Sequence, residues 1–257
     1  MRSRSRRRST SRAVRERWGR ALPPSSGFAG DDGSADTELA ELLAGHVAGR
    51  AALRDVVARL AATRVLVPVL AELGELGETE DGLHVDKEAS AGVVALEAPD
   101  GRRALPVFTS VAAMTAWRAD ARPVPVEAPR AALSAVSEDW SLLVVDPAGP
   151  ATVLVPRPAV WALAQGKPWR PAVEDGVVDP EVVQAVTSAV APLQHVASVD
   201  AEPGRTAEVA VVLRLDPGLD RGGLDGVLAA VNARLGASEV VGERVDSLEL
   251  RIGAARG

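Results

Sequence analysis

The apolar residues of this chain come in short runs, each closed by proline, glycine or charged residues. The longest runs, such as residues 65–71, are far shorter than the roughly 20 residues with which a helix crosses a bilayer. Runs of this length suit short strands and helices of a few turns. The chain therefore has to fold from many short elements, and we expect no insertion into a membrane.

The core has to be built with almost no aromatic side chains. Hydrophobic residues make up 47% of the sequence, but aromatic residues make up only 3%, and Tyr is absent. Val, Leu and Ala must therefore fill the interior through many small contacts. Cys is absent too, which excludes disulfides and thiolate metal ligands. The first residues lack the apolar stretch of a secretory signal, so we expect a cytoplasmic protein.

Charge divides the chain into a basic tail and an acidic body. Residues 1–20 hold nine Arg and one Glu, although the whole chain has a net charge of −6. Residues 1–35, rich in Arg and Ser, predict a disordered tail. It is either an electrostatic arm that could bind nucleic acid or acidic lipid, or leader sequence translated from a start codon placed too far upstream. The acidic body should repel nucleic acid.

Turn and helix signals predict a first domain over residues 36–170. Asp36 or Thr37 can cap a helical pattern, which continues past Gly45 and Gly49 either as two short helices or as one broken helix. Pro68 should place its strand at a sheet edge or a bulge. The pattern predicts strands at 64–70, 92–97, 103–108, 141–145 and 152–155, the last four as two hairpins, and helices at 110–117, 129–136 and 158–165.

A second domain is expected over residues 180–253, after a linker at 166–179 with the sequence GKPWRPAVEDGVVD. Its pattern predicts helices at 180–190 and 219–235 and strands at 193–199, 207–215 and 248–252. This order suggests a small sheet covered on one face by two helices. The fold class is thus α+β: two small domains, each a mixed or antiparallel sheet with short helices, behind a disordered basic N-terminal tail.

Several separated motifs carry a family resemblance. They are VFTSV at 107–111, AWR at 116–118, DARPVP at 120–125, LLVVDPAGP at 142–150 and VPRPAVWALAQG at 155–166. In this order they resemble the N-terminal domain of the SseB family as found in high-GC bacteria, over about residues 50–170. Residues 180–253 resemble the family's smaller C-terminal domain. The family is named for an enhanced serine sensitivity phenotype, and the resemblance supplies no catalytic residues.

No motif predicts catalytic, cofactor-binding or metal-binding residues. A metal site needs three or four converging ligands. His46 sits at the edge of an apolar helical face, His84 lies in a charged loop, and His195 lies in a predicted strand. The acidic residues at 72–81 fit a solvated loop better than a buried catalytic pair. A nucleophile elbow, a phosphate loop and a dinucleotide fingerprint are all missing.

The tryptophans offer the one candidate contact site. Trp117 and Trp161 fall on apolar helical faces and should be core, and Trp140 should pack at the start of a strand. Trp169 and Arg170 lie between prolines in the expected linker. They form either a protein-contact hot spot or an anchor that attaches the linker to the first domain, and the anchor is the favoured interpretation.

These observations favour a non-enzymatic protein-binding or adaptor module whose partner is another protein or a second copy of the chain. The alternative is a small-metabolite sensor, suggested by the family's name, and an enzyme without a sequence motif comes third. The three differ in what a structure should contain. An adaptor needs an exposed apolar surface, whereas an enzyme needs a deep pocket with converging polar groups.

Overall fold

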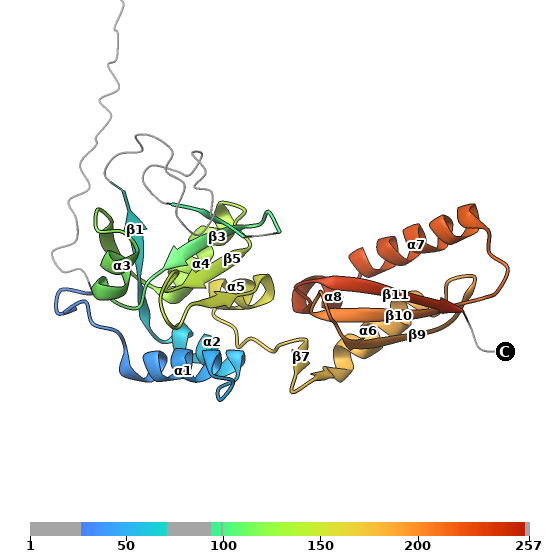
Figure 1. The fold of residues 1–257 in the computed structure, drawn as a ribbon, viewed down its shortest axis with the longest axis horizontal. Helices are drawn as coiled ribbons and strands as arrows, with labels where there is room; N and C mark the ends of the chain where they lie inside the picture. The colour runs from blue at the N-terminus through green and yellow to red at the C-terminus, as the bar shows by residue number, and fades with distance from the viewer. Residues whose placement is uncertain (1–26, 71–93, 99, 255–257) are drawn as a thin grey trace, which may run out of the picture. The chain divides into compact units, whose positions relative to one another are not determined.

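The computed structural model describes residues 27–70, 94–98 and 100–254, and Figure 1 shows their fold. Helices alternate with small mixed or antiparallel sheets, which confirms the α+β class. Two large clusters of buried side chains form the core, one from residues 39–163 and one from residues 172–245. We refer to the elements around these two clusters as the first and the second domain. Most of the expected tail, His84 and the acidic residues 72–81 lie outside the described residues.

A four-stranded sheet organises the first cluster, with the strand order β2-β3-β5-β6. The antiparallel pairs β2–β3 and β5–β6 are the two expected hairpins, and the parallel pair β3–β5 joins them into one sheet. Parallel neighbours need a long crossover, which the segment between β3 and β5 provides. The strands are β2 (Leu96–Glu97), β3 (Arg103–Val107), β5 (Leu142–Val145) and β6 (Val153–Val155).

Four helices pack their apolar faces into the same cluster. They are α1 (Thr37–Val47), α2 (Leu53–Ala61), α4 (Ala128–Ser137) and α5 (Arg157–Ala164). The cap of α1 is Asp36, whose carboxylate accepts a 2.8 Å hydrogen bond from the Leu39 N–H. Two helices form rather than one broken helix, because Gly49 takes a left-handed conformation (φ +70°) between α1 and α2.

Strands β1 (Arg64–Val69) and β4 (Arg122–Glu127) form an antiparallel ribbon beside this sheet. Leu66 bonds through its N–H and its C=O to Phe108, at 2.8 and 2.9 Å, on the side away from β4. Antiparallel strands alternate the direction of these groups. Pro68, opposite Pro123, and Pro125, opposite Leu66, therefore direct their missing N–H groups away from the ribbon. Two alternate prolines hid β4 from the sequence analysis, and this geometry shows why they are tolerated.

Helix α3 (Val111–Trp117) closes one end of the ribbon with a small cluster of its own. Ser110 caps the helix through a 3.1 Å bond from the Ala113 N–H to its hydroxyl. Phe108 is fully buried there, and its ring centroid lies 5.2 Å from that of Trp117.

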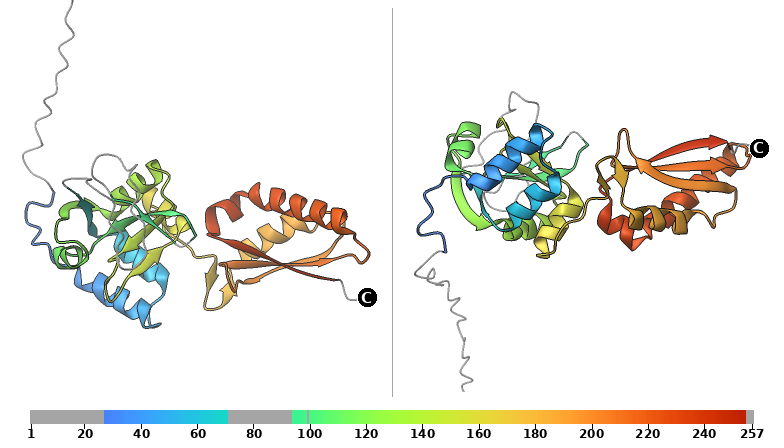
Figure 2. Two further views of the ribbon diagram at one scale, coloured as in Figure 1. Left: turned by 45° about the horizontal axis from the view of Figure 1, so that its top comes forward. Right: turned by 90° about the horizontal axis from the view of Figure 1, so that it is seen from below.

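The second domain is a three-stranded sheet with the order β11-β10-β9, in which β10 runs parallel to β11 and antiparallel to β9. Figure 2 shows helices α6 and α7 together on one face of it, as expected. The elements are α6 (Pro180–Val190), β9 (Val196–Pro203), β10 (Val209–Leu215), α7 (Arg221–Gly236), α8 (Glu239–Arg244) and β11 (Leu248–Ala254). The short α8 was not expected. Residues 170–257 contain no aromatic residue, so this core is aliphatic throughout.

The segment at 166–179, which was expected to be a linker, contains a short ordered hairpin. Strands β7 (Val173–Glu174) and β8 (Val177–Val178) pair across Asp175 and Gly176, whose φ angles of +51° and +74° suit a tight hairpin turn. Ala172 and Val178 are buried in the second cluster. In the described part of the chain, no helix has both the length and the apolar character to cross a membrane.

Candidate functional site

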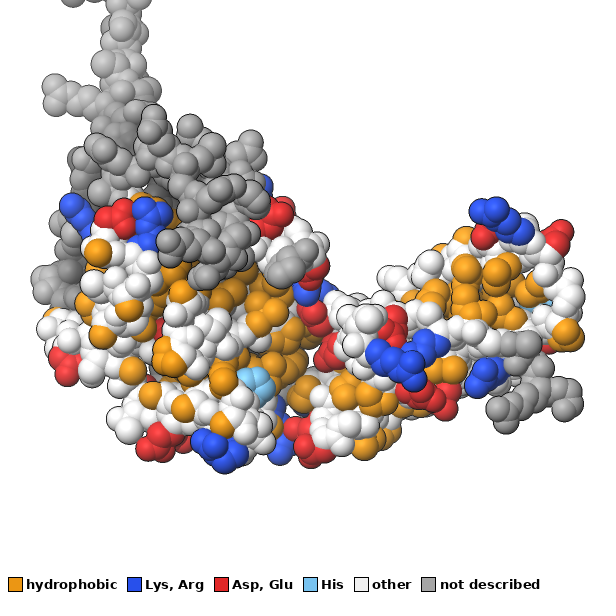
Figure 3. Space-filling model, in the orientation of Figure 1, with side chains coloured by type: hydrophobic (Ala, Val, Ile, Leu, Met, Phe, Trp, Pro, Cys, Tyr) orange, Lys and Arg blue, Asp and Glu red, His pale blue; other side chains and the backbone are white. Residues whose placement is uncertain are grey.

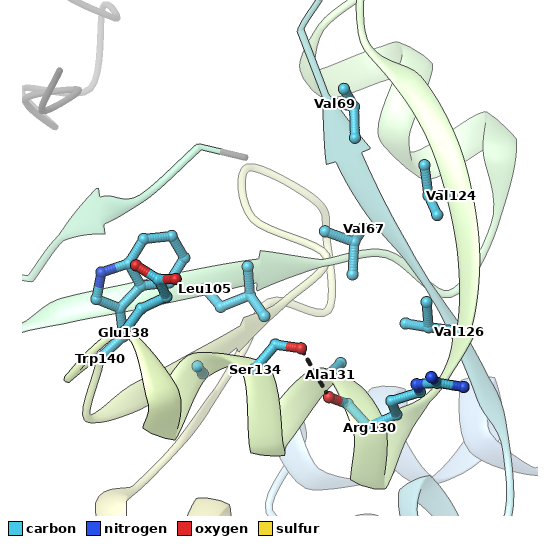
Figure 4. A pocket seen from close by; sticks show the side chains of 11 residues that line it. Val67, Val69, Leu105, Val124, Val126, Arg130, Ala131, Ser134, Glu138 and Trp140 are labelled. Atoms are coloured by element: carbon cyan, nitrogen blue, oxygen red, sulfur yellow. Dashed lines mark hydrogen bonds between the residues drawn. The ribbon is translucent and has the colours of Figure 1, made fainter. Parts of the chain in front are cut away.

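The first domain contains an open cavity of about 340 Å³ between the β1–β4 ribbon and helix α4 (Figure 4). Its lining comes from three segments that are far apart in sequence, namely β1, β3 and the continuous stretch from β4 through α4 to residue 140. The lining residues are Val67, Val69, Leu105, Val124, Val126, Arg130, Ala131, Ser134, Ala135, Glu138 and Trp140. Only three of them carry a group that is charged or a hydroxyl, so the cavity is an apolar site with a polar rim.

The ribbon supplies a wall of four valines. Side chains alternate between the two faces of a strand, so Val67 and Val69 share one face of β1. Val124 and Val126 of β4 lie on the same side, because Val67 is the register partner of Val124. Figure 4 shows these four side chains along the two strands of the ribbon, with Val67 and Val126 nearest to α4. Val124 is 41% exposed, which is high for a β-branched side chain that faces a cavity.

Helix α4 supplies the opposite wall. Ala131 and Ala135, four residues apart, are buried against the core, and their small side chains leave room above the helix. Arg130, Ser134 and Glu138 form the neighbouring stripe and edge the opening. With a rise of 1.5 Å per residue, the Cα atoms of Arg130 and Glu138 lie about 12 Å apart along the helix axis.

The floor is closed by two buried side chains, Leu105 from β3 and Trp140 from the loop before β5. The chain turns sharply ahead of Trp140, since Asp139 has a φ of +58°. The backbone N–H of Trp140 then donates a 2.9 Å hydrogen bond to the Ala135 C=O. Trp140 is only 4% exposed, and it joins the first cluster at the start of a strand as the sequence suggested.

The chemistry of this lining suits recognition of apolar groups. The Ser134 hydroxyl donates a 3.0 Å hydrogen bond to the Arg130 C=O of its own helix turn. The charged side chains of Arg130 and Glu138 lie at opposite ends of the opening rather than converging on one point. Among the residues that the structure describes, no group of three or more His, Asp or Glu side chains is placed to hold a metal ion.

A second group in this domain is a half-buried carboxylate, Asp146, at the end of β5. It accepts hydrogen bonds from the Thr109 N–H at 2.8 Å and from the Thr109 hydroxyl at 2.7 Å. Burial raises the pKa of Asp146 above the usual value, although both bonds from Thr109 oppose that rise. The contact joins the ends of β3 and β5, and Thr109 itself is only 4% exposed. Both partners serve the fold, because each satisfies the other's polar groups.

The two described histidines have separate, local environments. The Nδ1 atom of His46 lies 3.1 Å from the Ala51 C=O, in the connection between α1 and α2. His195 lies just before β9 rather than inside a strand, with a φ of +65°, and its Nδ1 atom is 3.7 Å from the Asp216 carboxylate. Neither lies in the cavity.

Trp169 packs partly buried against the first cluster, so the indole anchors the chain beyond α5 to the first domain. Its Nε1 atom is buried and has no hydrogen-bond partner among the described residues. Arg170 is exposed and forms ion pairs with Asp179 at 3.2 Å and Glu181 at 3.6 Å. A protein-contact role for Trp169 and Arg170 stays a prediction, and neither residue lines the cavity. Trp161 was expected in the core but is 46% exposed, because it lies on the outer side of α5.

Sequence reasoning missed the cavity because β4 was not recognised. The signal was present: valines alternate with other residues at 65–69 and again at 122–126, which is the pattern of a strand with one apolar face. Pairing the two segments would have placed four valines on one wall.

A family model described as SseB protein N-terminal domain matches residues 39–162. This interval contains the whole cavity lining, and it agrees with the resemblance seen over residues 50–170. No curated protein and no solved structure gives a significant match to the chain. The resemblance of residues 180–253 to the C-terminal domain of the family stays a prediction.

Proposed function

We propose that this protein, which belongs to the SseB family through its N-terminal domain, is a non-enzymatic adaptor that binds apolar side chains of a partner protein in the cavity between β1–β4 and α4. The apolar lining of the cavity is the observation that carries the proposal. In keeping with the sequence, we place this activity in the cytoplasm.

The energetics of the lining support a protein partner. An aliphatic side chain that leaves water for such a site gains roughly 1.5–3 kcal/mol. The valine wall and the alanine stripe of α4 offer this gain without any polar group that must be matched. Arg130 and Glu138, at opposite ends of the opening, can then orient the flanking residues of an extended or helical segment through rim charges.

The same lining fits a polar metabolite poorly. An amino acid carries an ammonium group and a carboxylate on one carbon, and both lose water on binding. The two rim charges that could pair with them are about 12 Å apart along α4. Ser134 already donates its hydroxyl proton to the helix backbone. A small-metabolite sensor therefore stays the alternative against which the experiment discriminates.

The test places one negative charge in the cavity and a matched charge outside it. Val124→Glu alters the ribbon wall at a side chain that is 41% exposed. Leu133→Glu is the control: Leu133 lies on α4, is 52% exposed and does not line the cavity. Both positions are exposed enough to accept a charge without unfolding the domain, which circular dichroism would verify.

Affinity capture from the source cells, with quantitative mass spectrometry, should recover a partner with the wild-type chain and with Leu133→Glu but not with Val124→Glu. A partner recovered equally by all three chains would contradict a role for the cavity. If no partner is recovered, a thermal-shift screen of metabolites decides the alternative. A compound that stabilises the wild type by about 2.7 kcal/mol at a hundredfold excess over its Kd, but not Val124→Glu, would replace the adaptor by a sensor.

A further inference from the structure

The C-terminal strand β11 forms one outer edge of the second-domain sheet (Figures 1 and 2). Its pairing with β10 is parallel, with Val209 opposite Leu248, and the Val209 N–H bonds to the Ser247 C=O at 3.2 Å. In a parallel ladder, Val209 bonds to the two neighbours of Leu248 and not to Leu248 itself. Leu248, Leu250 and Ile252 therefore direct their N–H and C=O groups to the edge of β11 at which no described strand pairs.

At the opposite edge of the sheet, formed by β9, some outward backbone N–H groups are occupied or missing, so β9 is less suited than β11 to pair with another strand. Ala201 lies opposite Val211, so its N–H faces outward, but the Asp200 carboxylate accepts that N–H at 2.8 Å. Pro203, two residues on, has no N–H at all. Such features keep edge strands from pairing with other chains. The outward residues of β11 include no proline, and β11 pairs with β10 without a register shift.

The side chains of β11 alternate between apolar and charged residues, and reversing the strand direction exchanges its acidic residue with its basic residue. Leu248 and Leu250 face the helices and pack partly against the second cluster, and Ile252 at the end of that row is 49% exposed. Glu249 and Arg251 lie between them on the other face. Figure 3 shows apolar side chains at the surface between α7 and β11. The strand is thus apolar, acidic, apolar, basic, apolar.

We propose that β11 pairs antiparallel with β11 of a second copy of this chain, about a two-fold axis through Leu250, to form one continuous sheet. In this register Leu250 opposes Leu250 as a hydrogen-bonded pair, which uses the outward groups of both strands. Leu248 of one copy lies opposite Ile252 of the other on the helix face. Glu249 of one copy lies opposite Arg251 of the other on the open face.

The charges select this register over its neighbours. An axis through Glu249 would oppose two carboxylates, and an axis through Arg251 would oppose two guanidinium groups. Like charges directly opposite each other destabilise a strand pair, whereas opposite charges stabilise it. Within one copy Arg251 already contacts Glu249 and Glu202. Pairing about Leu250 therefore places Glu249 of each copy opposite Arg251 of the other copy, so that opposite charges face each other at both positions.

Light scattering coupled to size-exclusion chromatography tests the proposal on the full chain. The wild type should elute with twice the 26.6 kDa mass of one chain. Ile252→Pro removes an outward N–H from β11 and should yield a monomer. Val199→Pro is the matched control, because Val199 is an outward residue of β9 opposite Leu213. It removes an outward N–H from the other edge and should leave the dimer intact.

Exchanging the charges of Glu249 and Arg251 tests the pairing register without removing any backbone N–H group from β11. Arg251→Glu should weaken the dimer at least tenfold in Kd, because it opposes Glu249 with a second acid. The double variant Glu249→Arg with Arg251→Glu should restore the dimer, since the two positions then pair again. Thermal melts would show that each variant is folded. A monomeric wild type, a dimer that survives Ile252→Pro, or a folded Val199→Pro monomer would each overturn the proposal.

Discussion

The contact between Asp146 and Thr109 predicts a sharp difference between two substitutions of the same carboxylate. Asp146→Asn keeps an oxygen acceptor for the Thr109 N–H, and its amide can donate to the Thr109 hydroxyl. Asn also tolerates the left-handed backbone at this position, where φ is +48°. Asp146→Ala loses both acceptors and is strained by that φ angle.

The expected cost follows from the burial of Thr109, which is 4% exposed. A buried donor left without a partner costs about 1–3 kcal/mol, and Asp146→Ala leaves two. The strain of Ala at a positive φ adds roughly 1–2 kcal/mol. Water can enter beside the half-buried Asp146 position and recover part of this sum. We therefore expect a loss of about 3 kcal/mol for Asp146→Ala and less than about 1 kcal/mol for Asp146→Asn.

Urea unfolding followed by far-UV circular dichroism measures both values. The pH dependence adds an independent check. Burial raises the pKa of Asp146 in the folded state, so the folded chain binds this proton more tightly than the unfolded chain. The wild type should then lose stability as the pH rises from about 4, the usual Asp pKa, through the raised pKa. Asp146→Asn should lack this loss.

Two results would refute this reasoning. If Asp146→Asn were as damaging as Asp146→Ala, the negative charge rather than the acceptor geometry would stabilise the turn. If the stability difference between the wild type and Asp146→Asn did not change with pH, the carboxylate would not be desolvated in the folded chain.

Three further substitutions test the packing, the capping and the electrostatics. Phe108→Ala should lower the unfolding free energy by about 3–5 kcal/mol in urea titrations, because the ring is fully buried, whereas Trp161→Ala at a 46% exposed site should cost much less. Asp36→Ala should lower the free energy of unfolding by about 1 kcal/mol, because helix α1 loses its cap. The hydrogen bond from Arg59 lowers the pKa of Asp36 in the folded state. The stability difference between the wild type and Asp36→Ala in thermal melts should therefore shrink as the pH falls below about 4. Hydrogen bonds from the Thr206 hydroxyl and from the Thr206 and Arg205 N–H groups hold the pKa of Glu249 at about 2. The wild type should therefore lose stability relative to Glu249→Gln as the pH falls from 4.5 to 2. A stability difference that stays constant across that range would contradict these hydrogen bonds.

Much of the architecture could be predicted from local signals. The two hairpins, the cap at Asp36 and the helices α6 and α7 follow from turn residues and apolar spacing, whereas the short α8 was not expected. The parallel pairing of β3 with β5 could not be predicted, because it depends on which strands meet after a long crossover.

The candidate site could not be predicted because it depends on β4, a strand whose prolines argue against strand structure. Proline at Pro123 and Pro125 argues against a strand, and only the register with β1 shows that the missing N–H groups face away from the partner. The cavity is a tertiary feature assembled from β1, β3, β4 and α4. Its walls can be anticipated from alternating valines, but its volume cannot.

The uneven placement of aromatic residues has a practical consequence for spectroscopy. All five tryptophans precede residue 170, and four of them belong to described parts of the first domain or its anchor. With no Tyr in the chain and no Phe beyond residue 108, the second domain neither absorbs near 280 nm nor emits. Intrinsic fluorescence therefore follows the N-terminal half alone, while far-UV dichroism follows both domains. Superimposable transitions from the two probes would mean that the domains unfold as one cooperative unit, and a gap between them would give the stability of each without cutting the chain.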